Sequence, residues 1–239
     1  MPTLFFWGML GLVIGSFIGA YTYRYPRNIS IAKGRSFCPK CKKKISWFDN
    51  IPIGSFLFLK GRCRRCGKKI SLRYPLIELT GAVGFVAFAP NVFLIFTFCL
   101  LLAIFIIDLE EKLIPDELVF TGVLAAFLVF LLTDFNFYAN LLAGLGAAGF
   151  LLLINLASQG RGMGLGDVKL ALFLGVLLGP TNTILWLFVS FWLGGAIGLG
   201  LLFLGKARLK QEIAFGPFLI SAFFVILIWG EIIKKWIPL

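Results

Sequence analysis

Long apolar segments, separated by short connections, fill most of this chain and leave it few ways to fold. Hydrophobic residues make up 59% of the 239 residues, and charged residues make up only 14%. About 20 apolar residues are enough for a helix to cross the hydrocarbon core of a bilayer. The composition therefore predicts an all-α polytopic membrane protein. About eight transmembrane helices are expected, near residues 4–23, 76–90, 91–109, 115–133, 138–157, 168–179, 181–204 and 213–233.

The first apolar segment favours a retained membrane anchor over a secretory signal peptide. It follows no basic region, and no small-residue cleavage site precedes Arg24. Gly11, Gly15 and Gly19 recur every four residues and so lie on one face of the expected helix. Small residues at this spacing let two helices pack closely. We therefore expect this face to contact another helix.

The basic residues predict the orientation of the helices. Lys and Arg concentrate in every second connection, which the positive-inside rule assigns to the cytosol. Both termini are then outside, although Lys234 and Lys235 depart from the rule. The basic connections are residues 24–75, Glu110-Glu111-Lys112, the loop at Arg161, and 206–210; the connections at Pro90, Asp134 and Pro180 have no basic residue.

A basic segment separates the first apolar segment from the others. The sequence therefore divides into residues 1–23, a cytosolic segment 24–75, and a membrane domain 76–239. Fifteen of the 23 Lys and Arg lie between Arg24 and Arg73, so most of the +12 net charge is local. The basic segment contains no recognition helix and no aromatic RNA-binding motif, so nucleic acid is not the expected partner. Because membrane spans flank the segment, anionic lipid headgroups are favoured as its partner.

Two cysteine pairs within the basic segment predict a metal site. Cys38-Pro-Lys-Cys41 and Cys63-Arg-Arg-Cys66 are each followed by a Lys pair and Ile-Ser, which makes them an internal repeat. Two CxxC hairpins supply four thiolates to one structural zinc. The alternatives are two disulfides, which a reducing cytosol disfavours, and a loop without metal, which the duplication disfavours.

The sequence has no histidine, which leaves carboxylates as the candidate catalytic groups. Without histidine there is no Ser-His-Asp triad and no HExxH metal site. Asp167 follows Gly164-Leu165-Gly166 at the start of a short apolar segment, and an ionisable group at membrane depth indicates a functional site. The alternative is a helix cap, a common role for Asp. The predicted topology places Asp108 at the same cytosolic level as Asp167.

Several other polar residues have simpler interpretations. Asp116 follows Pro115 and is expected to cap a helix. Glu110 and Glu111 are expected to be solvated, and Cys99 is expected to pack in the membrane. For Lys169 two roles are weighed equally: reaching lipid headgroups or compensating the charge of Asp167.

These motifs together resemble the type IV prepilin peptidases, which are bifunctional leader peptidases and N-methyltransferases of the GxGD-type intramembrane aspartyl protease class. The resemblance covers nearly the whole chain. Ala214 departs from it, because proline is expected before the last motif. The matching motifs are Gly15-Ser16-Phe17 with Arg24 and Pro26, Asp49-Asn50-Ile51-Pro52 between the cysteine pairs, Arg73-Tyr74-Pro75 with Glu78, Asp108 before Ile114-Pro115-Asp116, Gly164 to Lys169, and Phe215-Gly216-Pro217-Phe218.

The resemblance implies a function and a location. It implies cleavage of prepilin or pseudopilin precursors after the glycine of a basic leader, followed by methylation of the new N-terminus from S-adenosylmethionine. The catalytic pair would be Asp108 and Asp167, supported by Gly164, Gly166 and Lys169, on the cytosolic side of a bacterial inner membrane. The chain has no Rossmann glycine motif. The cofactor site therefore stays unassigned; Asp49, Asn50 and Glu78 are candidates that equally fit turn and cap roles.

Other functions remain open from the sequence. An ion-coupled carrier would use Asp108 and Asp167 as ion ligands, but carriers usually have paired repeats, and only the cysteine pairs repeat here. A GxGD protease with another substrate class is the third possibility. The oligomeric state is not predicted.

Overall fold

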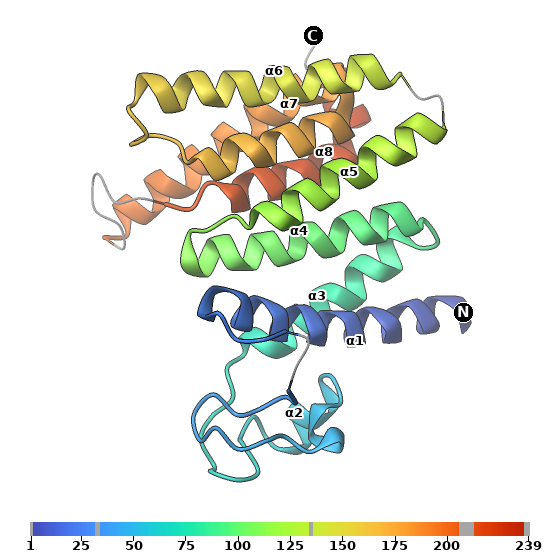
Figure 1. The fold of residues 1–239 in the computed structure, drawn as a ribbon, viewed down its shortest axis with the longest axis vertical. Helices are drawn as coiled ribbons and strands as arrows, with labels where there is room; N and C mark the ends of the chain where they lie inside the picture. Colours follow the sequence, from blue (N-terminus) through green and yellow to red (C-terminus); the bar gives the residue numbers. More distant parts are fainter. Residues whose placement is uncertain (1, 32–33, 134–135, 206–212, 237–239) are drawn as a thin grey trace. The chain divides into compact units, whose positions relative to one another are not determined.

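The structure is a computed structural model that describes residues 2–31, 34–133, 136–205 and 213–236. The described residues are nearly all helical, with two isolated β-bridges and no longer strand. Three short helical turns, η1 (Tyr25–Arg27), η2 (Trp47–Asn50) and α2 (Gly54–Phe58), lie in the basic segment. The long helices in Figure 1 are α1 (Pro2–Arg24), α3 (Arg73–Phe88), α4 (Val92–Glu111), α5 (Asp116–Leu132), α6 (Phe137–Ala157), α7 (Leu165–Phe203) and α8 (Gly216–Trp236).

Five of these helices, α1, α4, α6, α7 and α8, are long and apolar enough to cross a membrane. Helices α3 and α5 are shorter, with 16 and 17 residues. Helix α7 has 39 residues, but its backbone is non-helical at Gly179, where φ is 71° directly before Pro180. A proline interrupts the helical hydrogen bonds, so α7 breaks where the sequence predicts two separate spans. The fold class is confirmed, and the count of about eight spans stays a prediction.

The chain divides into two compact units, Met1–Ala103 and Ile104–Leu239, and the boundary falls inside α4. In the first unit, α1 packs against α3 through its glycine face, as the four-residue spacing predicts. A Cβ atom on Gly11 would lie 2.5 Å from the carbonyl oxygen of Gly81, and one on Gly15 would lie 2.9 Å from Cα of Glu78. The two backbones approach so closely that side chains at these positions would force them apart.

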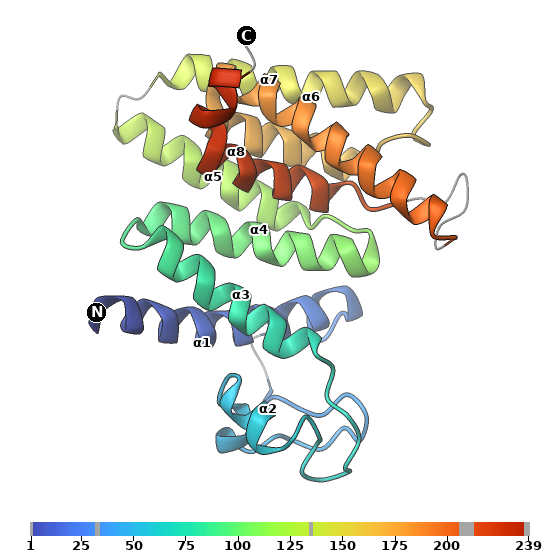
Figure 2. The same cartoon turned by 180° about the vertical axis from the view of Figure 1, so that it is seen from behind.

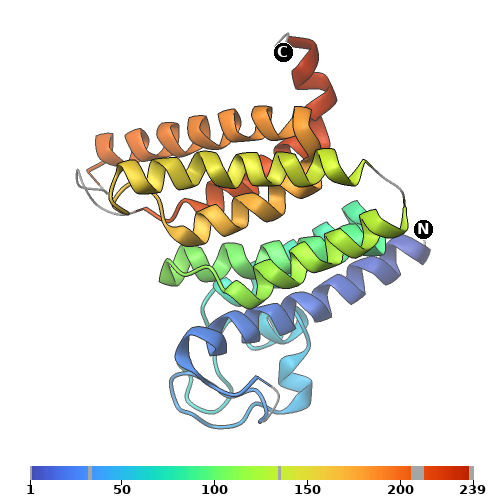
Figure 3. The ribbon, with the colours of Figure 1, turned by 45° about the horizontal axis from the view of Figure 1, so that its top comes forward.

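In the second unit, α7 contacts α5, α6 and α8 (Figure 2). Gly144 of α6 lets the two backbones touch, because its Cβ would lie 2.7 Å from the carbonyl oxygen of Leu172. Trp186 of α7 is fully buried and donates a hydrogen bond to the Leu219 carbonyl of α8 at 2.8 Å. These contacts hold α7, whose first turn carries Asp167, against α6 and α8 (Figure 3).

The charge alternation gives a testable topology. A cysteine at Asn136, an exposed residue before α6, should react with a membrane-impermeant maleimide added to intact cells. A cysteine at exposed Gln159, after α6, should react only once the membrane is opened, because the helix between them crosses the bilayer. The chain with its native cysteines provides the background. Labelling of position 159 in intact cells would contradict the cytosolic level assigned to the two aspartates.

Candidate active site and metal centre

Asp108 lies in the last turn of α4 and is 4% exposed. Its Oδ2 atom is buried and has no hydrogen-bond partner among the described residues. The first residue of α8, Gly216, lies against this oxygen: a Cβ atom on Gly216 would be 2.5 Å from Oδ2. Burying a carboxylate oxygen without a hydrogen-bond partner is costly. Such an arrangement indicates a group kept for chemistry rather than for stability.

Asp167 lies in the first turn of α7 and is 8% exposed. Its Oδ2 atom accepts a hydrogen bond from the backbone N–H of Gly164 at 3.2 Å. A carboxylate at this position satisfies one of the N–H groups that a helix start leaves unpaired. Asp167 therefore binds the start of its own helix with one oxygen, from the third helical position, while Gly164 occupies the N-cap position. Gly166 lets Ile114 pack on this turn, since its Cβ would be 3.0 Å from that side chain.

The two aspartates line one cavity of about 370 Å³ and are close enough to interact electrostatically. Their segments are far apart in sequence and meet because α7 begins beside the loop that follows α4. The five residues that the sequence assigns to the catalytic site, namely Asp108, Gly164, Gly166, Asp167 and Lys169, all lie in the cavity wall. The lining residues are Asp108, Lys112, Leu113, Ile114, Asp116, Gly164, Leu165, Gly166, Asp167 and Lys169.

Lys169 and Asp116 form an ion pair that the sequence does not predict. Lys169 Nζ donates to both carboxylate oxygens of Asp116 at 2.8 and 2.7 Å, and the two side chains are 39% and 51% exposed. Asp116 begins α5, as expected of an acid at a helix start, and its carboxylate pairs with Lys169. Lys169 therefore compensates Asp116 and not Asp167. The pair joins the starts of α5 and α7 at the cavity mouth.

An exposed ion pair of this kind should contribute little to stability. A double-mutant cycle of Asp116→Ala and Lys169→Ala is expected to give a coupling energy of about 0.2–1 kcal/mol. Reversible unfolding in detergent, followed by circular dichroism, measures it. A coupling of several kcal/mol would show that the pair is shielded from solvent in the membrane, contrary to its exposure here.

The four cysteines of the two CxxC motifs are positioned to bind one metal ion. Their sulfur atoms all lie within 4.8 Å of one another, and all are free thiols. Four thiolates 2.3 Å from a tetrahedral zinc would be roughly 3.8 Å apart, so this set fits zinc.

The two knuckles are structural copies. In the first, the N–H of Cys38 donates to Lys43 O at 2.9 Å; in the second, Cys63 donates to Lys68 O at 3.0 Å. The residue after each second cysteine has positive φ, 59° at Lys42 and 67° at the corresponding glycine. The sequence repeat thus reflects a repeated turn.

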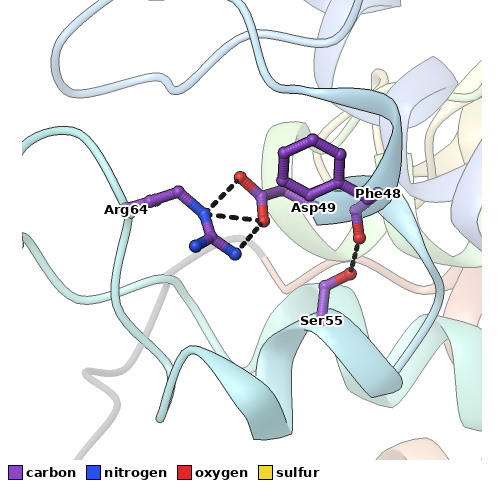
Figure 4. A network of polar contacts seen from close by, with 4 residues as sticks. All are labelled: Phe48, Asp49, Ser55 and Arg64. Atoms are coloured by element: carbon purple, nitrogen blue, oxygen red, sulfur yellow. Dashed lines mark hydrogen bonds and ion pairs between the residues drawn. The ribbon is translucent and has the colours of Figure 1, made fainter.

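The candidate cofactor residues have structural partners. Asp49 accepts hydrogen bonds from Arg64 Nε and Nη2 (Figure 4), the shortest 2.7 Å. Glu78 is 8% exposed and accepts a 2.7 Å hydrogen bond from the backbone N–H of Ile53. Asn50 is exposed at the end of η2. These contacts match turn and scaffold roles, and the methyl-donor site stays unassigned.

The sequence does not predict the positions of two residues of the site. Gly216 belongs to one of the motifs shared with the family, but nothing in the sequence predicts that it lies against Asp108. The sequence predicts Lys112 only as a basic residue of a cytosolic turn, whereas the structure places it in the cavity wall. Glu110 and Glu111 are exposed, as expected, although they lie in the last turn of α4.

Fold and site together define a multi-pass membrane protein with a pair of buried carboxylates and a separate four-cysteine module. Two family models match the chain: the Bacterial Peptidase A24 N-terminal domain over residues 9–92 and the Type IV leader peptidase family over residues 95–199. The chain belongs to the type IV leader peptidase family.

Similar proteins include prepilin leader peptidase/N-methyltransferases of three bacteria. The one from Aeromonas hydrophila is 36% identical, over 88% of this chain and 76% of the relative. The one from Bacillus subtilis is 33% identical over 93% of both chains. The one from Klebsiella pneumoniae is 39% identical over 73% of this chain and 86% of the relative. No solved structure shows a significant match.

Proposed function

We propose that this protein cleaves the leader peptides of prepilin-like precursors, with Asp108 and Asp167 as the catalytic pair, and methylates the new N-terminus. The family and the names of its relatives support the activity. The observation that carries the catalytic assignment is that two buried carboxylates from distant segments line one cavity. A carboxylate pair suits peptide hydrolysis in a chain that contains no histidine.

The pair performs the hydrolysis as one unit. Two neighbouring carboxylates share a proton, because both do not ionise easily side by side. The ionised aspartate takes a proton from water, whose oxygen attacks the scissile carbonyl carbon while the protonated aspartate donates a hydrogen bond to the carbonyl oxygen. The C–N bond then breaks, and the leaving amine takes up a proton from the pair. No covalent enzyme intermediate forms.

The glycine turn before α7 has a supporting role. The N–H of Gly164 holds Asp167, which fixes the orientation of that carboxylate. The N–H groups of Leu165 and Gly166 belong to the first helical turn and have no carbonyl four residues earlier within α7. They are the candidates to bind the substrate backbone or the developing oxyanion.

The other parts of the protein have separate roles in this proposal. Residues 1–23 form an anchor, residues 24–75 fold around one structural zinc held by the four cysteines, and residues 76–239 form the catalytic domain. S-adenosylmethionine supplies the methyl group. The enzyme lies in the bacterial inner membrane with its catalytic side toward the cytosol, in contact with membrane lipids.

Incubation of the purified protein with a prepilin, with and without S-adenosylmethionine, tests this function. Mass spectrometry should show leader loss in both samples and a further methyl group only with the methyl donor. Leader loss without methylation would limit the protein to a peptidase. Absence of both, combined with aspartate-dependent ion uptake into vesicles, would support the ion-coupled carrier instead.

A further inference from the structure

Five large apolar side chains form an exposed edge on the cysteine module, which we call the apolar edge. It consists of Trp47 and Phe48 of η2, Ile51 directly after η2, and Leu57 and Phe58 of α2. Trp47 is 75% exposed and Phe58 is 80% exposed, although neither belongs to a membrane-spanning helix. A contiguous exposed apolar surface marks a contact with a partner or a membrane.

The depth of this edge follows from two contacts within the first unit. Ile53 lies between the two halves of the edge and donates its N–H to Glu78, in the second turn of α3. Glu78 in turn lies against Gly15 of α1. Gly15 precedes Arg24, at the end of α1, by nine residues, which is about 13 Å at a rise of 1.5 Å per residue. Ile53 is therefore level with the middle of α1 and not with its end.

The figures agree with this placement. Figures 1 to 3 show α2 beside the middle of α1 rather than beyond its last turn. Since α1 is long and apolar enough to cross a membrane, a segment beside its middle is placed at the depth of lipid rather than of bulk water.

The charge of the module complements an anionic lipid surface. Between residues 24 and 75 the only acidic residue is Asp49, and it is paired with Arg64. The knuckles carry exposed basic side chains, including Lys43, Lys44 and Lys68. Basic residues near a membrane surface attract anionic headgroups, and aromatic residues prefer the membrane interface.

The apolar edge is held as one unit with the second cysteine knuckle. Arg64, between Cys63 and Cys66, binds Asp49 of η2 and lies over the ring of Phe48, with 5.4 Å between Cζ and the ring centroid. Ser55 of α2 donates to the Phe48 carbonyl at 3.0 Å (Figure 4). This network holds η2 and α2 together, so the apolar edge is already formed in the protein without a bound partner.

We propose that the apolar edge inserts into the leaflet nearest the module, so that the cysteine module is a membrane-embedded part of the protein while its basic knuckles face the anionic headgroups. The aromatic and aliphatic side chains contact the lipid acyl chains. This proposal does not depend on the catalytic assignment of Asp108 and Asp167.

Photocrosslinking in the full-length, zinc-loaded protein tests the insertion. Phe58→p-benzoylphenylalanine and Leu57→p-benzoylphenylalanine place the probe on the apolar edge, and Lys68→p-benzoylphenylalanine provides a matched exposed control on a knuckle. In nanodiscs of phosphatidylcholine with phosphatidylglycerol, mass spectrometry is expected to find several-fold more lipid adducts at positions 57 and 58 than at 68. Zinc content verifies that each variant is folded.

Three outcomes would overturn the proposal. Equal lipid adducts at 58 and 68 would mean that the edge is not inserted. Adducts to a second copy of the chain in place of lipid would make the edge a subunit interface. Adducts to an added prepilin in place of lipid would make it a substrate-docking surface. The aspartate variants should keep the lipid adducts even if they lose all cleavage, which separates this inference from the proposed function.

Discussion

Replacing Asp108 or Asp167 with Asn is expected to abolish leader cleavage while the protein remains folded. Asparagine keeps the size of the side chain and its hydrogen bonds but neither accepts the proton of the attacking water nor shares one with its partner. Loss of one member of a catalytic unit costs roughly 10⁴-fold or more in rate. Leader release should be measured on membranes with matched zinc content.

The losses should not add, because the pair acts as a unit. The double variant should be about as inactive as either single variant. Glu111→Gln is the matched control: it changes an exposed acid in the same last turn of α4 but not the cavity. If the methyltransferase site is separate, an already cleaved pilin should still be methylated by Asp167→Asn. Normal cleavage by that variant would leave Asp167 only its capping role.

Loss of the metal should unfold the cysteine module. Cys63→Ser is expected to lower bound zinc well below one ion per chain, because serine does not replace a thiolate ligand. Zinc binding contributes about 10–16 kcal/mol to folding in small zinc-finger peptides, more than a polar segment of this size gains from a core. Zinc content by elemental analysis and protease resistance of residues 24–75 measure the effect.

Cys99→Ser provides the control for this result. Cys99 lies in α4, outside the four-cysteine cluster, so its loss should change neither zinc content nor protease resistance of the module. Addition of a chelator to the native protein should reproduce the Cys63→Ser result. A zinc-free Cys63→Ser protein with a native, protease-resistant module would reject a structural metal.

The helices could be predicted from the sequence because each is a long apolar run ended by charges, proline or glycine. The expected segment 138–157 corresponds to α6 (Phe137–Ala157), and the expected break after residue 179 lies at Gly179–Pro180. The four cysteines could be grouped because a duplicated CxxC pattern has a metal as its simplest explanation. These features depend on local pattern alone.

The polar contacts could not be predicted because they depend on which helix starts are neighbours in space. Lys169 has Asp167 two residues away in sequence, yet it binds Asp116 because α5 and α7 begin side by side. The Ile53 N–H has no sequence signal that directs it to Glu78. Charge and spacing identify candidates for contacts, but helix packing decides between them.

If Asp108 is catalytic, as proposed, the position of Gly216 against it has a consequence for the synthesis of the protein. Helices inserted one after another place Asp108 and Asp167 in the membrane before the ribosome has made α8. Until α8 arrives, the wall beside the Asp108 Oδ2 atom is missing and that carboxylate is open to water or lipid. Under the proposed catalytic assignment, a nascent or C-terminally shortened chain would hold both acids without the enclosed site, and we expect it to be inactive until the last helix is complete.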